Sequence, residues 1–137
     1  MKRMLFLMLI LLTNITLFAQ TQNLNKKTKL LVYYFHVTDR CNTCRSIEAV
    51  TTKVLNENFK NELDSEIIVF KTFNVEYPEN KYICEKYQAY GATLALTKVE
   101  FGAEVKIDDM TNFAFSKIHS EEIFIQGLKA KIEEYLK

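Results

Sequence analysis

Two cysteines, Cys41 and Cys44, lie in the segment Cys41-Asn42-Thr43-Cys44 and form a C-x-x-C pattern. A disulfide can join two thiols at this spacing, and a thiolate can attack a disulfide of a partner molecule. Cys41 would make that attack and form a mixed disulfide, which Cys44 would then resolve. The pattern therefore predicts thiol–disulfide exchange with Cys41 and Cys44 as the catalytic residues.

The pair lies between a predicted strand and a predicted helix. Residues 30–37 (LLVYYFHV) are apolar, aromatic and β-branched without strict alternation, which is typical of a strand buried on both faces. From residue 41 to about residue 63, apolar side chains recur at helical spacing. The partial positive charge at a helix N-terminus stabilises a thiolate. Arg40 and Arg45 flank the pair, and we expect their charge to lower the thiol pKa further.

The remaining pattern predicts further strands over residues 67–75 and 93–100, a short helix over 81–90, a fourth strand that opens at 105–107, and a last helix over 121–136. Residues 108–117 follow no clear period. Strands separated by helices are expected to pair in parallel, and the last two strands, joined by a tight turn, to pair antiparallel. This order predicts an α/β fold in which helices flank a mixed β-sheet.

The first nineteen residues have the layout of a signal peptide. Lys2 and Arg3 precede an apolar run over residues 4–18, and cleavage is expected after Ala19. The alternative is an uncleaved anchor, but a spanning helix needs about 20 apolar residues, and this run has 15 with three polar interruptions. The sequence predicts an exported protein, periplasmic or secreted, with one domain over residues 20–137. No stable membrane insertion is expected once the segment is cleaved.

Composition and cysteine count exclude other classes of protein. The 18 Lys and Arg nearly balance the 17 Asp and Glu, which argues against a nucleic-acid partner. Three cysteines cannot form a fully paired disulfide framework within one chain. An exported redox pair plus a bystander fits this count. Cys84 is expected to be a small core residue on the helix over 81–90, with a regulatory or intermolecular thiol as the alternative.

The order of elements, together with Tyr33-Tyr34-Phe35-His36 ahead of a dicysteine at a helix start, resembles the thioredoxin superfamily over roughly residues 28–137. The resemblance implies a thioredoxin-like three-layer fold and a thiol–disulfide oxidoreductase that uses no cofactor. Its partners would be protein thiols or disulfides. A membrane electron-transfer protein would serve as the source or sink of electrons. The direction of electron flow does not follow from the fold.

Three features around the pair depart from the superfamily pattern. Asn42-Thr43 replaces the Gly-Pro that thioredoxins have between the cysteines, and Arg40 replaces their Trp. Phe35 falls near the position of their buried acid. His36 is adjacent, and we consider it as a proton acceptor for Cys44. The alternative for His36 is a buried histidine whose hydrogen bonds are satisfied.

The superfamily also has a cis-proline opposite the dicysteine, which contacts substrate. Aligning Lys86-Tyr87 with the Lys-Tyr of the family places Ala92 and Thr93 at or near that site. Ala92 and Thr93 are therefore the candidate substrate-binding residues. A trans peptide bond is expected at Ala92, because a cis bond that does not involve proline costs about 2.5–4 kcal/mol.

Two alternative functions remain open at this point. The missing Trp, acid and cis-proline favour a redox-inactive thioredoxin-like binding module. A metal-binding protein is the other alternative, since heavy-metal domains of the ferredoxin-like class also place C-x-x-C between a strand and a helix. Those domains continue with two successive strands after that helix. Here the predicted helix over residues 81–90 intervenes, which favours the thioredoxin-like arrangement.

Overall fold

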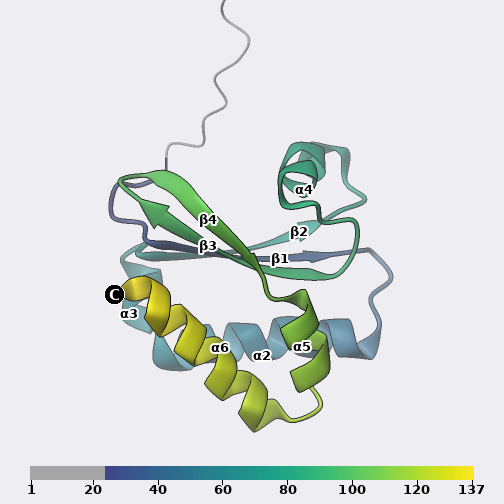
Figure 1. The fold of residues 1–137 in the computed structure, drawn as a ribbon. Coiled ribbons are helices and arrows are strands. Elements are labelled where there is room, and N and C mark those ends of the chain that lie inside the picture. Colours follow the sequence, from purple (N-terminus) through teal and green to yellow (C-terminus); the bar gives the residue numbers. More distant parts are fainter. Residues whose placement is uncertain (1–23) are drawn as a thin grey trace, which may run out of the picture.

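A four-stranded sheet forms the middle layer of the computed structural model, which describes residues 24–137 (Figure 1). The strand order is β2-β1-β3-β4. The strands are β1 (Leu30–His36), β2 (Ile68–Asn74), β3 (Thr93–Glu100) and β4 (Ala103–Asp109). The predicted signal peptide over residues 1–19 lies outside the described residues, and so does the start of the predicted domain.

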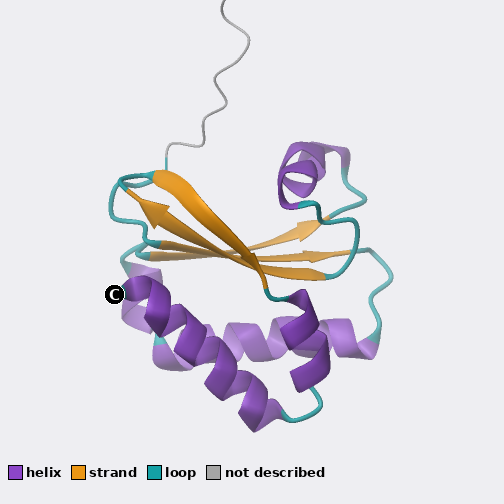
Figure 2. Cartoon of the chain, viewed as in Figure 1, coloured by secondary structure: helices purple, strands orange, loops and turns teal. Residues whose placement is uncertain are grey.

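Helices cover both faces of this sheet (Figure 2). One face is covered by α4 (Lys81–Tyr87), which follows the short helix η2 (Pro78–Asn80). The opposite face is covered by α2 (Asn42–Asn58), α3 (Lys60–Asp64), α5 (Thr111–Lys117) and α6 (Glu121–Leu136). These three layers confirm the predicted α/β fold with helices on both faces of a mixed sheet.

Two predicted elements differ in detail from the structure. The helix predicted over residues 41–63 is divided at Phe59, whose backbone leaves helical geometry at φ −134° and ψ 28°. The Phe59 side chain is buried in the core, so the interruption between α2 and α3 lies at a residue whose ring packs inside the protein. Residues 108–117, which had no clear period, form the end of β4 and the helix α5.

Strand pairing confirms one expectation and corrects another. β1 and β2 are parallel, and β3 and β4 are antiparallel, both as predicted. β3, however, is antiparallel to β1, although a helix precedes it. With seven residues, α4 spans about 10 Å, whereas a seven-residue strand such as β1 spans about 23 Å. The short helix α4 therefore does not carry the chain back along the length of the strands, and β3 starts at the edge where β2 ends.

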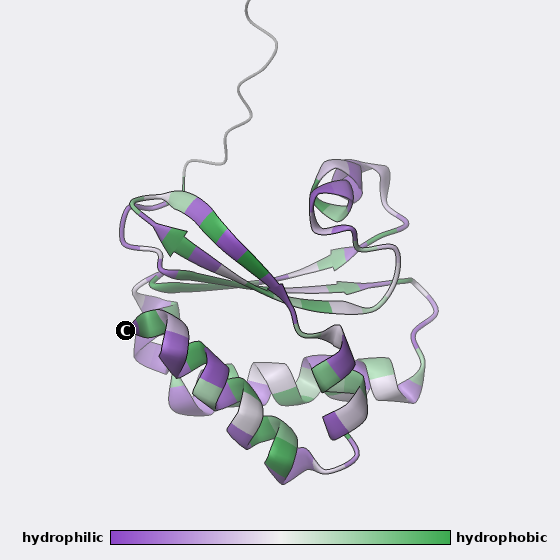
Figure 3. Cartoon of the chain, in the orientation of Figure 1, coloured by the Kyte–Doolittle hydropathy of each residue, from purple (hydrophilic) through white to green (hydrophobic). Residues whose placement is uncertain are grey.

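β1 is the central strand and supplies both halves of the core. Leu30, Val32 and Tyr34 pack toward α2 and α6, and Leu31, Tyr33 and Phe35 pack toward α4. This confirms the prediction of a strand buried on both faces. β4, by contrast, alternates between hydrophilic and hydrophobic residues, as expected of an edge strand (Figure 3). Both core clusters lie wholly within residues 24–137.

The edge of the sheet at the end of β1 is the place that positions the cysteines. β1 ends at His36, and the loop over residues 37–41 leads into α2. β3 begins at the same edge, because Thr93 pairs with Phe35. Among residues 24–137, none of the helices combines the length and the apolar character that crossing a membrane requires.

Candidate active site

Cys41 is the N-cap residue of α2, and Cys44 lies in the first turn of the same helix. The backbone of Cys41 is extended, with φ −68° and ψ 163°, as is usual for an N-cap. Its Sγ accepts a hydrogen bond from the backbone N–H of Cys44 at 3.3 Å. Both side chains are free thiols. The helix start therefore holds a dithiol whose first sulfur already receives a backbone donor.

The two thiols differ in exposure and in acidity. Cys41 is exposed, whereas Cys44 is only 9% exposed. Hydrogen bonds from the Cys44 thiol and from backbone N–H groups of the first turn lower the pKa of Cys41. Burial raises the pKa of Cys44, and its hydrogen bond to Cys41 and the charge there raise it further. Cys41 is therefore the better nucleophile, and Cys44 is the protected second thiol.

The lowered pKa of Cys41 comes from hydrogen bonds and not from the two flanking arginines, which corrects the expectation from the sequence. The guanidinium of Arg40, in the loop before α2, forms an ion pair with the carboxylate of Glu48 in the second turn of that helix. Both side chains of this pair are partly buried. The positive charge of Arg40 is thereby compensated by the Glu48 carboxylate and not by the Cys41 thiolate.

Tyr34 is a site residue that the sequence analysis did not identify. Its hydroxyl, buried beneath the first turn of α2, donates a hydrogen bond to the Cys44 carbonyl oxygen at 2.8 Å. Burial, followed by the negative charge of Cys44, raises the pKa of Tyr34, so the hydroxyl stays a donor. The alternation along β1 offered a clue, because Tyr34 belongs to the face that turns toward α2.

The structure does not connect His36 to the dithiol. His36 is half-buried at the end of β1, and its Nδ1 lies 3.0 Å from the Val37 carbonyl oxygen. Among the described residues, no hydrogen bond joins His36 to Cys41 or Cys44. Phe35, near the position of the missing acid, points to the opposite face and stacks on Phe73 with a ring separation of 5.3 Å. No acidic side chain of β1 thus replaces the family's acid.

Ala92 and Thr93 lie at the start of β3, at the edge that leads to the cysteines. Both are partly buried, and the Thr93 hydroxyl donates to the Gly91 carbonyl oxygen at 3.3 Å. Every peptide bond between residues 24 and 137 is trans, which includes the bond at Ala92. The topology therefore brings Ala92 and Thr93 to the edge of the dithiol without a direct hydrogen bond to it.

A groove of about 580 Å³ lies between the end of β1 and α4. Its wall combines Val37, Pro78 and the exposed ring of Tyr90 with the buried thiol of Cys84. Cys84 is 6% exposed, and burial raises the pKa of its thiol. It packs among the core residues on the α4 side, as the sequence predicted. The described part of the chain holds no group of three or more His, Cys, Asp or Glu side chains suited to a metal ion.

Comparison with known proteins yields a likeness of structure without a likeness of sequence. No family model and no curated protein matches the chain. A mutant thioredoxin from Halobacterium salinarum NRC-1 matches with a TM-score of 0.51 and 19% identity, over 83% of this chain and 80% of that one. Thioredoxin O2 from Arabidopsis thaliana, in its oxidised state, matches with a TM-score of 0.51 and 15% identity, over 85% and 83%.

These similarities define the class of fold. The chain has a thioredoxin-like fold. Its Cys41–Cys44 pair lies at the start of α2, after the loop that follows β1. The fold class and the resemblance inferred from the sequence are confirmed.

Proposed function

We propose that the protein is an exported thiol–disulfide oxidoreductase that exchanges disulfides with partner proteins through Cys41 and Cys44. The observation that supports this most directly is the difference in exposure and acidity between the two thiols. An exposed sulfur with a lowered pKa caps the helix, and a buried sulfur with a raised pKa lies within the first turn behind it. Thiol–disulfide exchange requires such an attacking thiolate and such a resolving thiol.

The exchange proceeds in two displacement steps. The Cys41 thiolate attacks one sulfur of a partner disulfide, a mixed disulfide forms, and the other partner sulfur leaves as a thiolate that takes up a proton. Cys44 then loses its proton and attacks Cys41 Sγ, which releases the second partner thiolate and closes the Cys41–Cys44 disulfide. The partner gains two electrons and the protein loses two. The reverse sequence oxidises a partner dithiol through the same intermediates.

Ala92 and Thr93 are proposed as the place where a partner chain lies during exchange, since they share the sheet edge with the end of β1. His36, at the end of β1, forms no hydrogen bond to either thiol among the described residues, so its role as a proton acceptor for Cys44 stays a prediction. A membrane electron-transfer protein is the proposed source or sink of electrons. Export rests on Lys2, Arg3 and the apolar run over residues 4–18.

The second candidate is a thioredoxin-like binding module without redox turnover. It is favoured by one observation: Ala92, which the alignment places at or near the position of the family's cis-proline, has a trans peptide bond. In that case Cys41 and Cys44 would close a static disulfide.

Reduction of insulin by dithiothreitol distinguishes the two candidates. We expect the protein to accelerate the precipitation of reduced insulin, the Cys41→Ser variant to lose this effect, and the Cys84→Ser variant to keep it. Equal rates for the protein and its Cys41→Ser variant contradict the proposal. The reduction potential of the Cys41–Cys44 pair, measured against glutathione, then assigns the direction: a low potential indicates a reductant and a high potential an oxidant.

A further inference from the structure

The turn between β3 and β4 contains a side chain that neither folding nor solubility explains. Phe101 is 99% exposed, and its backbone is left-handed, with φ 54°. Gly102 follows with φ 82°. A two-residue hairpin turn of this kind favours Asn, Asp or Gly at its first position, and a bulky side chain at positive φ is a conformational outlier. A fully exposed aromatic ring in a strained backbone suggests a contact outside the molecule.

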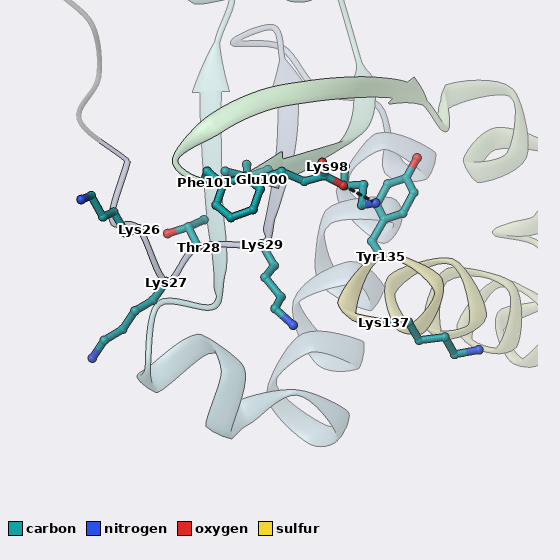
Figure 4. A pocket seen from close by; sticks show the side chains of 10 residues that line it. Lys26, Lys27, Thr28, Lys29, Lys98, Glu100, Phe101, Tyr135 and Lys137 are labelled. Carbon is teal, nitrogen blue, oxygen red and sulfur yellow. Dashed lines mark ion pairs between the residues drawn. The ribbon is translucent and has the colours of Figure 1, made fainter.

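Basic side chains surround this ring. With Phe101 they form what we call the basic hairpin face, made of Lys26, Lys27, Lys29, Lys98 and Lys137 (Figure 4). These residues border a pocket of about 540 Å³, whose single acidic side chain is Glu100.

Few of these lysines are neutralised within the molecule. Glu100 pairs with Lys98 at 2.6 Å, and Lys29 donates to the Leu136 carbonyl oxygen at 3.1 Å. Among residues 24–137, no ion pair involves Lys26, Lys27 or Lys137. In Figure 4 the side chains of these three residues extend outward. The face therefore combines a positive rim with one apolar projection.

The chain enters the fold at this face. A Cβ atom at Gly102 would lie 3.6 Å from the Leu24 carbonyl oxygen, so the first described residue lies beside the hairpin. The apolar run over residues 4–18 precedes it in sequence by only a few residues. The predicted export through a membrane would bring this face close to a lipid surface.

We propose that the basic hairpin face docks on an anionic lipid bilayer, with Phe101 inserted among the headgroups and the lysines on lipid phosphates. Lysines near an anionic membrane and an aromatic ring at its interface are the two contributions that hold a peripheral protein on a bilayer. The aliphatic stems of the lysines add apolar surface below the charges. This proposal is independent of the redox chemistry.

Docking in this way orients the dithiol. The basic hairpin face lies where β1 begins, and Cys41 lies beyond the end of β1. β1 separates the two sites by about 23 Å. The exposed sulfur of Cys41 would thus point away from the bilayer, where a partner protein can reach it.

Fluorescence tests the docking directly, because the chain has no Trp. The test uses residues 20–137, which contain every described element and lack the apolar run. With Phe101→Trp as the only Trp, we expect a blue shift and quenching by brominated lipid on phosphatidylglycerol vesicles, and neither on phosphatidylcholine vesicles. Binding should weaken steeply as salt rises. Absence of binding, or equal binding to both lipids, overturns the proposal.

Two double variants with the same net charge distinguish docking through the basic hairpin face from a general electrostatic attraction of the protein to the vesicles. Lys26→Glu with Lys27→Glu should weaken binding at least about 20-fold. Lys81→Glu with Lys117→Glu, on exposed helix positions outside the basic hairpin face, should leave it within about threefold. Equal losses in the two double variants contradict a defined face.

Phe101→Asn removes the aromatic ring without destabilising the turn. Asn is favoured at this turn position, so thermal stability should be kept or increased. Binding to phosphatidylglycerol vesicles should nonetheless fall about tenfold or more, because the inserted ring is lost. Unchanged binding by Phe101→Asn contradicts the inserted ring and with it the proposal.

Discussion

Only two residues separate Cys41 and Cys44 in the sequence, but the fold makes their sulfurs chemically unequal. Cys41 caps α2 and remains exposed, so first-turn donors reach its sulfur from within the helix. Cys44 lies one turn further along and is buried against the sheet. The same helix start thus lowers the pKa of one thiol, while burial raises the pKa of the other. Unequal thiols fix the order in which they react, because only the thiolate attacks.

Removal of the second thiol is predicted to make the first less acidic. In Cys44→Ala the hydrogen bond from the Cys44 thiol, the largest cause of the lowered pKa of Cys41, is lost, while the backbone N–H of residue 44 stays. The midpoint of iodoacetamide alkylation of Cys41 against pH should therefore rise in this variant. It should still remain below that of a cysteine without such donors, because the backbone N–H groups of the first turn are kept.

Mass spectrometry of the alkylated peptide over a pH series measures this midpoint. Cys84→Ala is the matched control, since Cys84 lies in the core on the α4 side, and its midpoint for Cys41 should equal that of the parent. A midpoint that falls or stays fixed in Cys44→Ala would contradict the assigned hydrogen bond.

At this scale the sequence identified the pair but not all of its surroundings. The C-x-x-C spacing and the preceding strand sufficed to assign Cys41 and Cys44. Tyr34 was not identified as a site residue. Its hydrogen bond to Cys44 depends on how closely α2 packs on the sheet, and no local sequence pattern encodes that distance. The expected effect of Arg40 was wrong for a similar reason, since Glu48 comes within reach only after the loop and the helix have formed.

At the scale of elements, α2 is tied to the sheet at its first turn. The Tyr34 hydroxyl on β1 reaches the Cys44 carbonyl oxygen, while apolar side chains of α2 pack further along the helix. This bond joins the helix that presents the dithiol to the central strand. The dithiol thus lies at the start of a helix that is hydrogen-bonded to the sheet, and not on a free loop.

Tyr34→Phe is predicted to destabilise the fold by about 1 kcal/mol, because a buried hydrogen bond is lost without a change of packing. For a domain of this size that corresponds to a fall in Tm of about 4 °C. Tyr33→Phe is the matched control on the neighbouring position, since the Tyr33 hydroxyl forms no hydrogen bond among the described residues. Thermal unfolding followed by circular dichroism compares the two variants, and equal losses would contradict the role of Tyr34.

The elements themselves were largely predictable, because strand β1 and helix α2 have clear hydrophobic patterns. The direction of β3 was not. The helix predicted over residues 81–90 led us to expect a parallel β3, because strands separated by helices usually pair in parallel. The observed α4 has only seven residues, and the chain enters β3 at the edge where β2 ends. The break at Phe59 likewise reflects core burial, which a helical period does not reveal.

Across the whole molecule, the two proposed sites occupy opposite ends of the sheet. The dithiol lies beyond the end of β1, and the basic hairpin face lies where β1 begins. Between them, the edge strand β4 is fixed to the last helix by one carboxylate. Asp108 accepts hydrogen bonds from Tyr135 and from Lys131, the latter at 3.1 Å, and another from Lys106 of its own strand at 3.1 Å.

This carboxylate is predicted to make the stability of the whole fold sensitive to acid. Burial alone would raise the pKa of Asp108, but the hydrogen bonds from Tyr135, Lys106 and Lys131 outweigh it and lower the pKa to about 2. Since the folded-state pKa lies below the ordinary value of about 3.9, the stabilisation is complete above that value. It is lost as pH falls from about 4 through about 2.

The loss attributable to Asp108 should amount to about 1–2 kcal/mol, after allowance for its partial exposure to solvent. Asp108→Asn removes the titrating group, so the free energy of unfolding of this variant should fall less steeply between pH 5 and pH 2 than that of the parent. Urea unfolding at a series of pH values measures the difference. Asp39→Asn, on the exposed loop before Cys41, is the matched control and should follow the parent curve. Parallel curves for the parent and Asp108→Asn would show that β4 and α6 are held together by packing alone.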